Sequence, residues 1–210
     1  MTAFHPVVKI PASTLEQGRL PVPRLLCALL LLLNVAVVPG AARAAEPKYT
    51  RSIERYQIPD VTLVNQDGER VRLKALLESD EVVLVDFIYA TCTTICPVLS
   101  AGFSSLQRKL APEGKTPRLV SISIDPDHDT PAIMKEYLQR YRAGKGWSFL
   151  TGTRTDIDLV LKALDAYIPN KMSHYPLVEM RSPADGTWVR LFGLMGTKDL
   201  LEEYRKVAPR

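Results

Sequence analysis

Apolar residues from about position 61 onward form two kinds of pattern along this 210-residue chain. Two continuous runs rich in β-branched residues, EVVLVDFIY at 81–89 and PRLVSISID at 117–125, have the length of strands buried on both faces of a sheet. Each run precedes a segment with apolar residues at the helical period, VLSAGFSSLQRKL at 98–110 and AIMKEYLQRYR at 132–142. Strands that alternate with helices indicate a sheet with helices packed on it.

Shorter patterns complete the predicted order of elements. VTLV and ERVRL flank NQDG, whose Asp67-Gly68 pair suits a β-turn, so residues 61–73 are predicted to form a β-hairpin. The later segments indicate strand, helix, strand, turn, strand and terminal helix: SFLTG, DIDLVLKALDAY, YPLVEM, SPADG, TWVRLFG and TKDLLEEYRKV. The prediction is an α/β sandwich, with a mixed central sheet flanked by helices and an N-terminal β-hairpin.

The N-terminal segment has a different pattern. Arg19 and Arg24 precede the apolar run LLCALLLLLNVAVV at 25–38, and small residues follow it, with Ala42 and Ala44 at the −3 and −1 positions of a cleavage site. This is the layout of a secretory signal. A helix of that run would span about 21 Å, less than the roughly 30 Å hydrocarbon core of a membrane, which favours cleavage over a permanent anchor.

These observations divide the chain into three parts. Residues 1–44 are interpreted as a signal peptide or a short membrane anchor, and residues 45–60, which are polar with two prolines, as an extended leading segment. Residues 61–210 form the predicted globular domain. Arginines before the apolar run place that domain outside the cytoplasm, either periplasmic or anchored to the inner membrane and facing the periplasm.

The net charge gives no support for nucleic acid as a partner. The chain has a formal net charge of +4, but residues 1–44 hold four basic residues and one acidic residue, which leaves 23 basic and 22 acidic residues beyond them. A net charge near +1 gives no reason to expect nucleic acid as a partner.

Two cysteines remain once the leader is set aside, Cys92 and Cys96 in FIYATCTTICPVLS. Cys92 falls in the loop after a buried strand, at the sheet edge where reactive groups collect in α/β proteins. Pro97 is tolerated only in the first turn of a helix, which places Cys96 in that turn, where the helix dipole is expected to favour its thiolate. Closing so short a loop gains little chain entropy, so the pair is interpreted as functional rather than as a structural disulfide.

Two thiolates alone make an incomplete metal site. Soft sulfur ligands suit Cu(I), and imidazole is a natural third donor. His174, in KMSHYPLVEM directly before a strand, is the better candidate, whereas His128 in the loop DPDHDT is interpreted as an exposed side chain. Met172 and Met180 are candidates for weak thioether contacts, with core packing the better explanation for Met180.

Three carboxylates surround His128. Asp125, Asp127 and Asp129 have the composition of a site for a hard metal ion, but they directly precede a predicted helix that opens with Thr130. Carboxylates are favoured at helix N-termini, so helix capping is the preferred interpretation.

With these residues assembled, the chain resembles the Sco/SenC copper-delivery family from about residue 61 to residue 207. The resemblance rests on DFIYATCTTICPVLS, on LVSISIDPDHDTPAIMKEYLQRY and on a histidine far downstream before a strand. It implies a thioredoxin-like fold and copper, as Cu(I) or Cu(II), bound by Cys92, Cys96 and His174. It also implies delivery to an apo copper enzyme or its CuA subunit, with another copper chaperone or a thiol reductant as further partners.

Two other functions remain open. A thiol-disulfide reductase would use Cys92 as the attacking thiol and Cys96 as the resolving one, and needs no metal. The two activities can coexist, but the expected role is that of a metallochaperone rather than an enzyme. A peroxidase of the peroxiredoxin type ranks lowest, because Thr93 to Cys96 match only part of that motif and Tyr89 stands where its proline belongs.

Overall fold

The computed structural model describes residues 48–115 and 117–208. The predicted signal or anchor segment lies outside these residues. Helices and strands follow in the order β1 (Tyr49–Glu54), β2 (Thr62–Asn65), β3 (Arg70–Arg72), α2 (Leu73–Leu77), β4 (Val83–Ile88), α3 (Cys96–Leu110), η1 (Ala111–Glu113), β5 (Arg118–Ser123), α4 (Pro131–Arg140), β6 (Trp147–Thr151), α5 (Arg154–Ala163), η2 (Lys171–Ser173), β7 (Leu177–Arg181), β8 (Trp188–Gly193) and α6 (Thr197–Val207).

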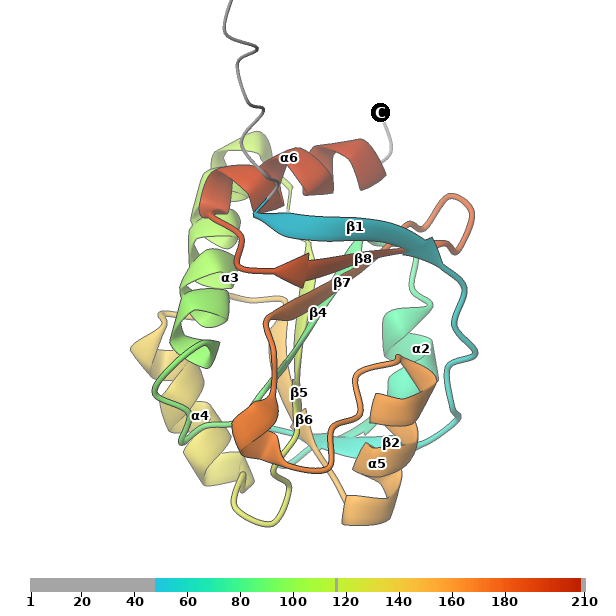
Figure 1. The fold of residues 1–210 in the computed structure, drawn as a ribbon. Coiled ribbons are helices and arrows are strands. Elements are labelled where there is room, and N and C mark those ends of the chain that lie inside the picture. The colour runs from blue at the N-terminus through green and yellow to red at the C-terminus, as the bar shows by residue number, and fades with distance from the viewer. Residues whose placement is uncertain (1–47, 116, 209–210) are drawn as a thin grey trace, which may run out of the picture. The chain divides into compact units, whose positions relative to one another are not determined.

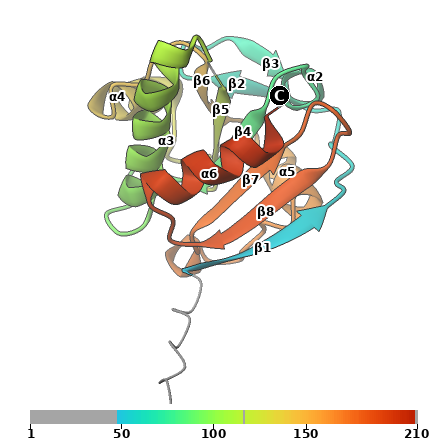
Figure 2. The same ribbon diagram turned by 90° about the horizontal axis from the view of Figure 1, so that it is seen from above.

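One mixed sheet contains all eight of these strands, in the order β1-β8-β7-β4-β5-β6-β2-β3 (Figures 1 and 2). β4 pairs in parallel with β5, and β5 with β6, while the other neighbouring pairs are antiparallel. Parallel strands need a crossover connection, and α3 and α4 supply the two that are required here. The mixed sheet predicted from the sequence is confirmed.

Helices cover both faces of this sheet. α3, α4 and α6 lie on one face, with α6 packed against α3, and α2 and α5 lie on the other (Figures 1 and 2). β4 is buried at every position and β5 at all but its first, which explains why both strands are continuously apolar in sequence. No helix within the described residues is both long and apolar enough to cross a membrane.

The predicted hairpin is formed by β2 and β3, which pair antiparallel. Its turn is closed by a 3.0 Å hydrogen bond from the amide of Gly68 to the carbonyl of Asn65. Gly68 has a φ of 79°, a left-handed conformation that glycine adopts without steric cost. The Asp67-Gly68 pair therefore indicated the turn correctly.

An edge strand, β1, was not assigned from the sequence. It lies within the segment interpreted as an extended lead-in, and it pairs antiparallel with β8 over its whole length. Its alternation is weak because four of its six residues are exposed, as is common for a strand at a sheet edge. Pairing with a strand about 140 residues later in the chain supplies the order that local sequence did not indicate.

Candidate metal centre

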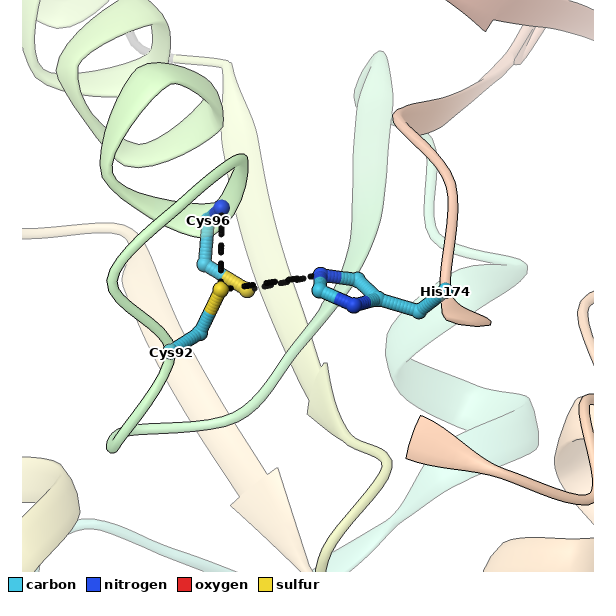
Figure 3. Close-up of side chains that lie close together, drawn as sticks. All are labelled: Cys92, Cys96 and His174. Carbon is cyan, nitrogen blue, oxygen red and sulfur yellow. Dashed lines mark hydrogen bonds between the residues drawn. The ribbon is translucent and has the colours of Figure 1, made fainter. Parts of the chain in front are cut away.

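Three potential ligands meet beside the start of α3. Cys92 follows β4, Cys96 is the first residue of α3, and His174 follows the η2 turn just before β7 (Figure 3). Nε2 of His174 lies 3.1 Å from Sγ of Cys96 and 3.7 Å from Sγ of Cys92. The three ligand atoms all lie within 4.8 Å of one another, and no other such group of Cys, His and acidic residues occurs among the described residues.

Both cysteines are free thiols with very different pKa values. Burial alone would raise the pKa of Cys92, but hydrogen bonds from the thiol and amide of Cys96 and from Thr94 lower it below its ordinary value. Burial raises the pKa of Cys96 far above that of a free thiol, and its hydrogen bond to Cys92 adds to the shift. The expectation of a thiolate at Cys96 is therefore wrong.

The reason for this reversal is local geometry. The amide at the first position of α3, that of Cys96, points at Sγ of Cys92, 3.4 Å away (Figure 3). A helix N-terminus stabilises the anion toward which its free amides are directed. Here that anion is the thiolate of Cys92 in the preceding loop, and not the sulfur of Cys96 itself.

The imidazole of His174 is oriented with Nε2 toward the two sulfurs. Its Nδ1 lies 2.9 Å from the carbonyl oxygen of Lys171, and because a carbonyl only accepts, Nδ1 carries the proton. The lone pair of Nε2 then faces the two sulfurs. Burial lowers the pKa of His174, which keeps this neutral tautomer in place at neutral pH.

Tyr89 packs beside the three potential ligands, and the sequence analysis did not identify it. Its ring meets the His174 ring edge to face, with centroids 5.2 Å apart, and the ammonium of Lys171 lies 5.4 Å from its centroid. Its hydroxyl lies 3.5 Å from Sδ of Met172. The one available signal was its position as the last residue of the apolar run before the cysteine loop.

Asp125 anchors the η2 turn through Lys171. Its buried carboxylate pairs with Lys171 and also contacts His128 at 3.1 Å and Arg154 at 3.8 Å. Although burial opposes it, the hydrogen bonds from Lys171 and His128, chiefly that from Lys171, hold the pKa of Asp125 below its usual value. Since the carbonyl of Lys171 orients His174, this ion pair indirectly positions the imidazole.

The three carboxylates of the loop before α4, those of Asp125, Asp127 and Asp129, neither form a metal-binding group nor cap the helix. Asp129 accepts hydrogen bonds from the amide of Ala90 and the hydroxyl of Ser123, and Asp127 pairs with Arg154. The N-cap of α4 is Thr130, which accepts a hydrogen bond from the third residue of the helix. The capping role expected for the carboxylates is therefore wrong, because they bind partners on other elements.

His128 and Met180 have the environments predicted from the sequence, exposed and buried respectively. The side chain of His128 is 65% exposed and stands outside the Cys-Cys-His group. Met180 is completely buried in β7, so it packs in the core, whereas Met172 is exposed.

A sequence model of the SCO1/SenC family matches residues 53–201. The chain belongs to this family. It is similar to a SCO1 protein homolog from Bacillus subtilis, with 38% identity over 116 residues. That alignment covers 54% of this chain and only 59% of the relative, so the match spans less than two thirds of the relative's length.

Solved SCO1/SenC structures have the same thioredoxin-like fold. BsSco, described as a member of the Sco family of cytochrome c oxidase assembly proteins, is 29% identical with a TM-score of 0.63, over 75% of this chain and 96% of that one. ScoI from Bradyrhizobium japonicum, solved with copper bound, is 24% identical with a TM-score of 0.59, over 74% and 100%. These similarities confirm the predicted fold and give the peroxidase hypothesis no support.

Proposed function

We propose that this SCO1/SenC protein binds copper through Cys92, Cys96 and His174 and delivers it to a copper enzyme outside the cytoplasm. The observation that carries the proposal is the convergence of two sulfurs and a neutral imidazole within 4.8 Å. Thiolates and imidazole are ligands that copper prefers. Further support comes from the copper-bound ScoI of the same fold and from the description of BsSco as belonging to oxidase assembly proteins.

The site is organised for a low coordination number. Cu(I) bound by two thiolates and Nε2 of His174 would be three-coordinate, and each cysteine would release a proton on binding. The ligands are held by the loop after β4, the start of α3 and a turn anchored by the ion pair of Lys171 and Asp125. A partner's thiolate can then replace these ligands one at a time, which transfers the ion without a change of charge on the metal.

The setting of this activity follows from the leader. We infer that residues 1–44 direct export or anchor the chain, and that residues 61–210 carry the copper-binding domain in the periplasm. An apo enzyme that acquires a CuA centre outside the cytoplasm is the partner that best fits this setting. Another copper chaperone would load the protein, and a thiol reductant would keep Cys92 and Cys96 reduced in an oxidising compartment.

Replacing the imidazole tests the metal site directly. In His174→Ala, we expect the affinity for Cu(I) to fall by more than about 100-fold, because the two thiols lose their third donor. A thiol reagent should still titrate two cysteines. Competition against a coloured Cu(I) chelator under anaerobic conditions measures the affinity, and His128→Ala is the matched control, since that histidine is exposed and outside the cluster. Equal affinities for wild type and His174→Ala would refute the proposed site.

A second function, thiol-disulfide reduction, is favoured by the asymmetry of the two thiols. The lowered pKa of Cys92 suits an attacking thiolate, and the raised pKa of Cys96 suits a thiol that resolves the mixed disulfide. In the first step the thiolate of Cys92 attacks the partner's disulfide, forms a mixed disulfide with one partner sulfur and releases the other as a thiolate. In the second step Cys96 attacks the sulfur of Cys92, which releases the second partner thiolate and leaves Cys92 and Cys96 joined in a disulfide.

A trapping experiment separates reduction from copper transfer. With copper chelated, Cys96→Ser should accumulate a mixed disulfide between Cys92 and an oxidised CuA-domain substrate, visible by non-reducing electrophoresis. Cys92→Ser is the control and should trap nothing. If His174→Ala reduces the substrate as fast as wild type, the reductase activity is independent of the metal site; if Cys96→Ser traps no adduct, Cys92 is not the attacking thiol.

A further inference from the structure

The ligands of the proposed copper site are difficult to reach from solvent. Cys96 is 0% exposed and Cys92 only 6%, and the imidazole of His174 is partly covered. A carrier that brings a copper ion therefore has limited access to the two sulfurs. A soft donor at the edge of the site would give the ion a first protein ligand before it reaches the two sulfurs.

Met172 has the properties of such a donor. It is 73% exposed, more than any other large apolar side chain among the described residues, and it lies two positions before His174. The other three methionines among the described residues, Met134, Met180 and Met195, are buried. A thioether is a soft, uncharged ligand that selects Cu(I) and binds it more weakly than a thiolate does.

The position of Met172 is held by contacts on both its backbone and its side chain. Its amide donates a 3.0 Å hydrogen bond to Oδ1 of Asn170, which caps the η2 turn. Its Sδ lies 3.5 Å from the hydroxyl of Tyr89, the ring that also packs against His174. Tyr89 therefore contacts both the thioether of the exposed Met172, through its hydroxyl, and the imidazole of His174, through its ring.

We propose that Met172 is a transit ligand, which takes Cu(I) at the surface and passes it to Cys92, Cys96 and His174. This inference rests on the proposed copper-binding function. A carrier ligand leaves the ion as Sδ bonds to it; bonds to Nε2 and the two sulfurs then form while the bond to Sδ breaks. Cys92 and Cys96 release their thiol protons to water, and the copper remains Cu(I) throughout.

The proposal predicts an effect on rate rather than on affinity. We would mix the fully reduced, full-length protein with the Cu(I)-bicinchoninate complex under anaerobic conditions and follow the loss of its colour by stopped flow. In Met172→Leu, which keeps the side-chain volume but removes the sulfur, uptake should slow about fivefold. The equilibrium affinity, from competition with the same chelator, should stay within about twofold of wild type.

Two further variants sharpen this experiment. Met180→Leu is the matched control, because the same substitution at a buried core position should leave the uptake rate unchanged. Tyr89→Phe keeps the ring against His174 but removes the hydroxyl near Sδ, so it should slow uptake by less than Met172→Leu does.

Each outcome decides one hypothesis. Equal uptake rates for wild type and Met172→Leu would overturn the transit role while leaving the three-ligand site intact. A loss of affinity as large as the loss of rate would also overturn it, because Met172 would then be a permanent fourth ligand. If wild type itself takes up no Cu(I), the proposed function fails, and the transit role fails with it.

Discussion

Asp86 is a buried acid that sits in β4 without the partners such a group normally has. The side chain is 0% exposed, and neither carboxylate oxygen has a hydrogen-bond partner within the described part of the chain. Burial raises the pKa of Asp86 to about 7. The protonation state of this carboxyl therefore changes in the neutral pH range, well above the range of an ordinary aspartate.

This pKa makes stability depend on pH in a defined direction. Because the folded pKa is above the unfolded one, the stabilisation is complete below about pH 4 and is lost as pH rises through about 7. Asp86→Asn removes the titration with little change of shape. Between pH 5 and 8.5, we expect the free energy of unfolding of wild type to fall relative to the variant by the order of a few kcal/mol.

Urea denaturation at several pH values measures this difference. The quantity compared is the slope of the free energy of unfolding with pH. Any cost of burying the amide in Asp86→Asn is the same at every pH, so it does not affect that slope. Parallel curves for wild type and variant would mean that Asp86 does not titrate in this range.

At the scale of elements, the edge of the sheet depends on one glycine. Gly193, at the end of β8, has a φ of 130°, and a Cβ there would lie 2.6 Å from the carbonyl oxygen of Lys48. The amide of Gly193 also donates to the carbonyl of Pro176, two residues after His174. The missing side chain lets β1 lie close to the end of β8. The hydrogen bond to Pro176 connects that strand end to the segment that carries His174.

Replacing this glycine should loosen that edge. We expect Gly193→Ala to lower the free energy of unfolding by about 3 kcal/mol, from backbone strain plus the clash with β1. Gly102→Ala in α3 is the matched control, because its Cβ would meet only Cδ2 of Leu200 at 3.7 Å. Helix propensity should make that variant equal to or more stable than wild type. A Gly193→Ala protein as stable as Gly102→Ala would show that the clash is relieved at no cost.

At the scale of the whole molecule, the proposed metal would link distant parts of the chain. Cys92 and Cys96 come from the β4-α3 connection, whereas His174 comes after β5, α4, β6 and α5. A ligand that binds only the assembled site stabilises the folded state by mass action. Copper should therefore act on the stability of the entire domain and not only on the loops that hold it.

Thermal unfolding with and without Cu(I) tests this linkage. At a free concentration about 1,000 times the dissociation constant, bound copper should add about 4 kcal/mol to the free energy of unfolding. A Cu(I) chelator should return the melting temperature to that of the apo protein. The shift should largely disappear in His174→Ala, and a wild type that melts at one temperature in both conditions would contradict the linkage.

The amino-acid sequence by itself determined the features that depend on near neighbours in the chain. The apolar runs of β4 and β5, the helical periods of α3 and α4, the glycine turn between β2 and β3, and Pro97 at the start of α3 are all local signals. They were sufficient to predict the fold class, and the resemblance they carried led to the correct family.

Only the tertiary structure decided the features that depend on groups far apart in sequence. It brought His174 to the sulfurs, paired Asp125 with Lys171, and ordered β1 along β8. Each of these depends on burial and on a partner many residues away, and neither the pKa of a thiol nor the reach of an imidazole is encoded by spacing along the chain.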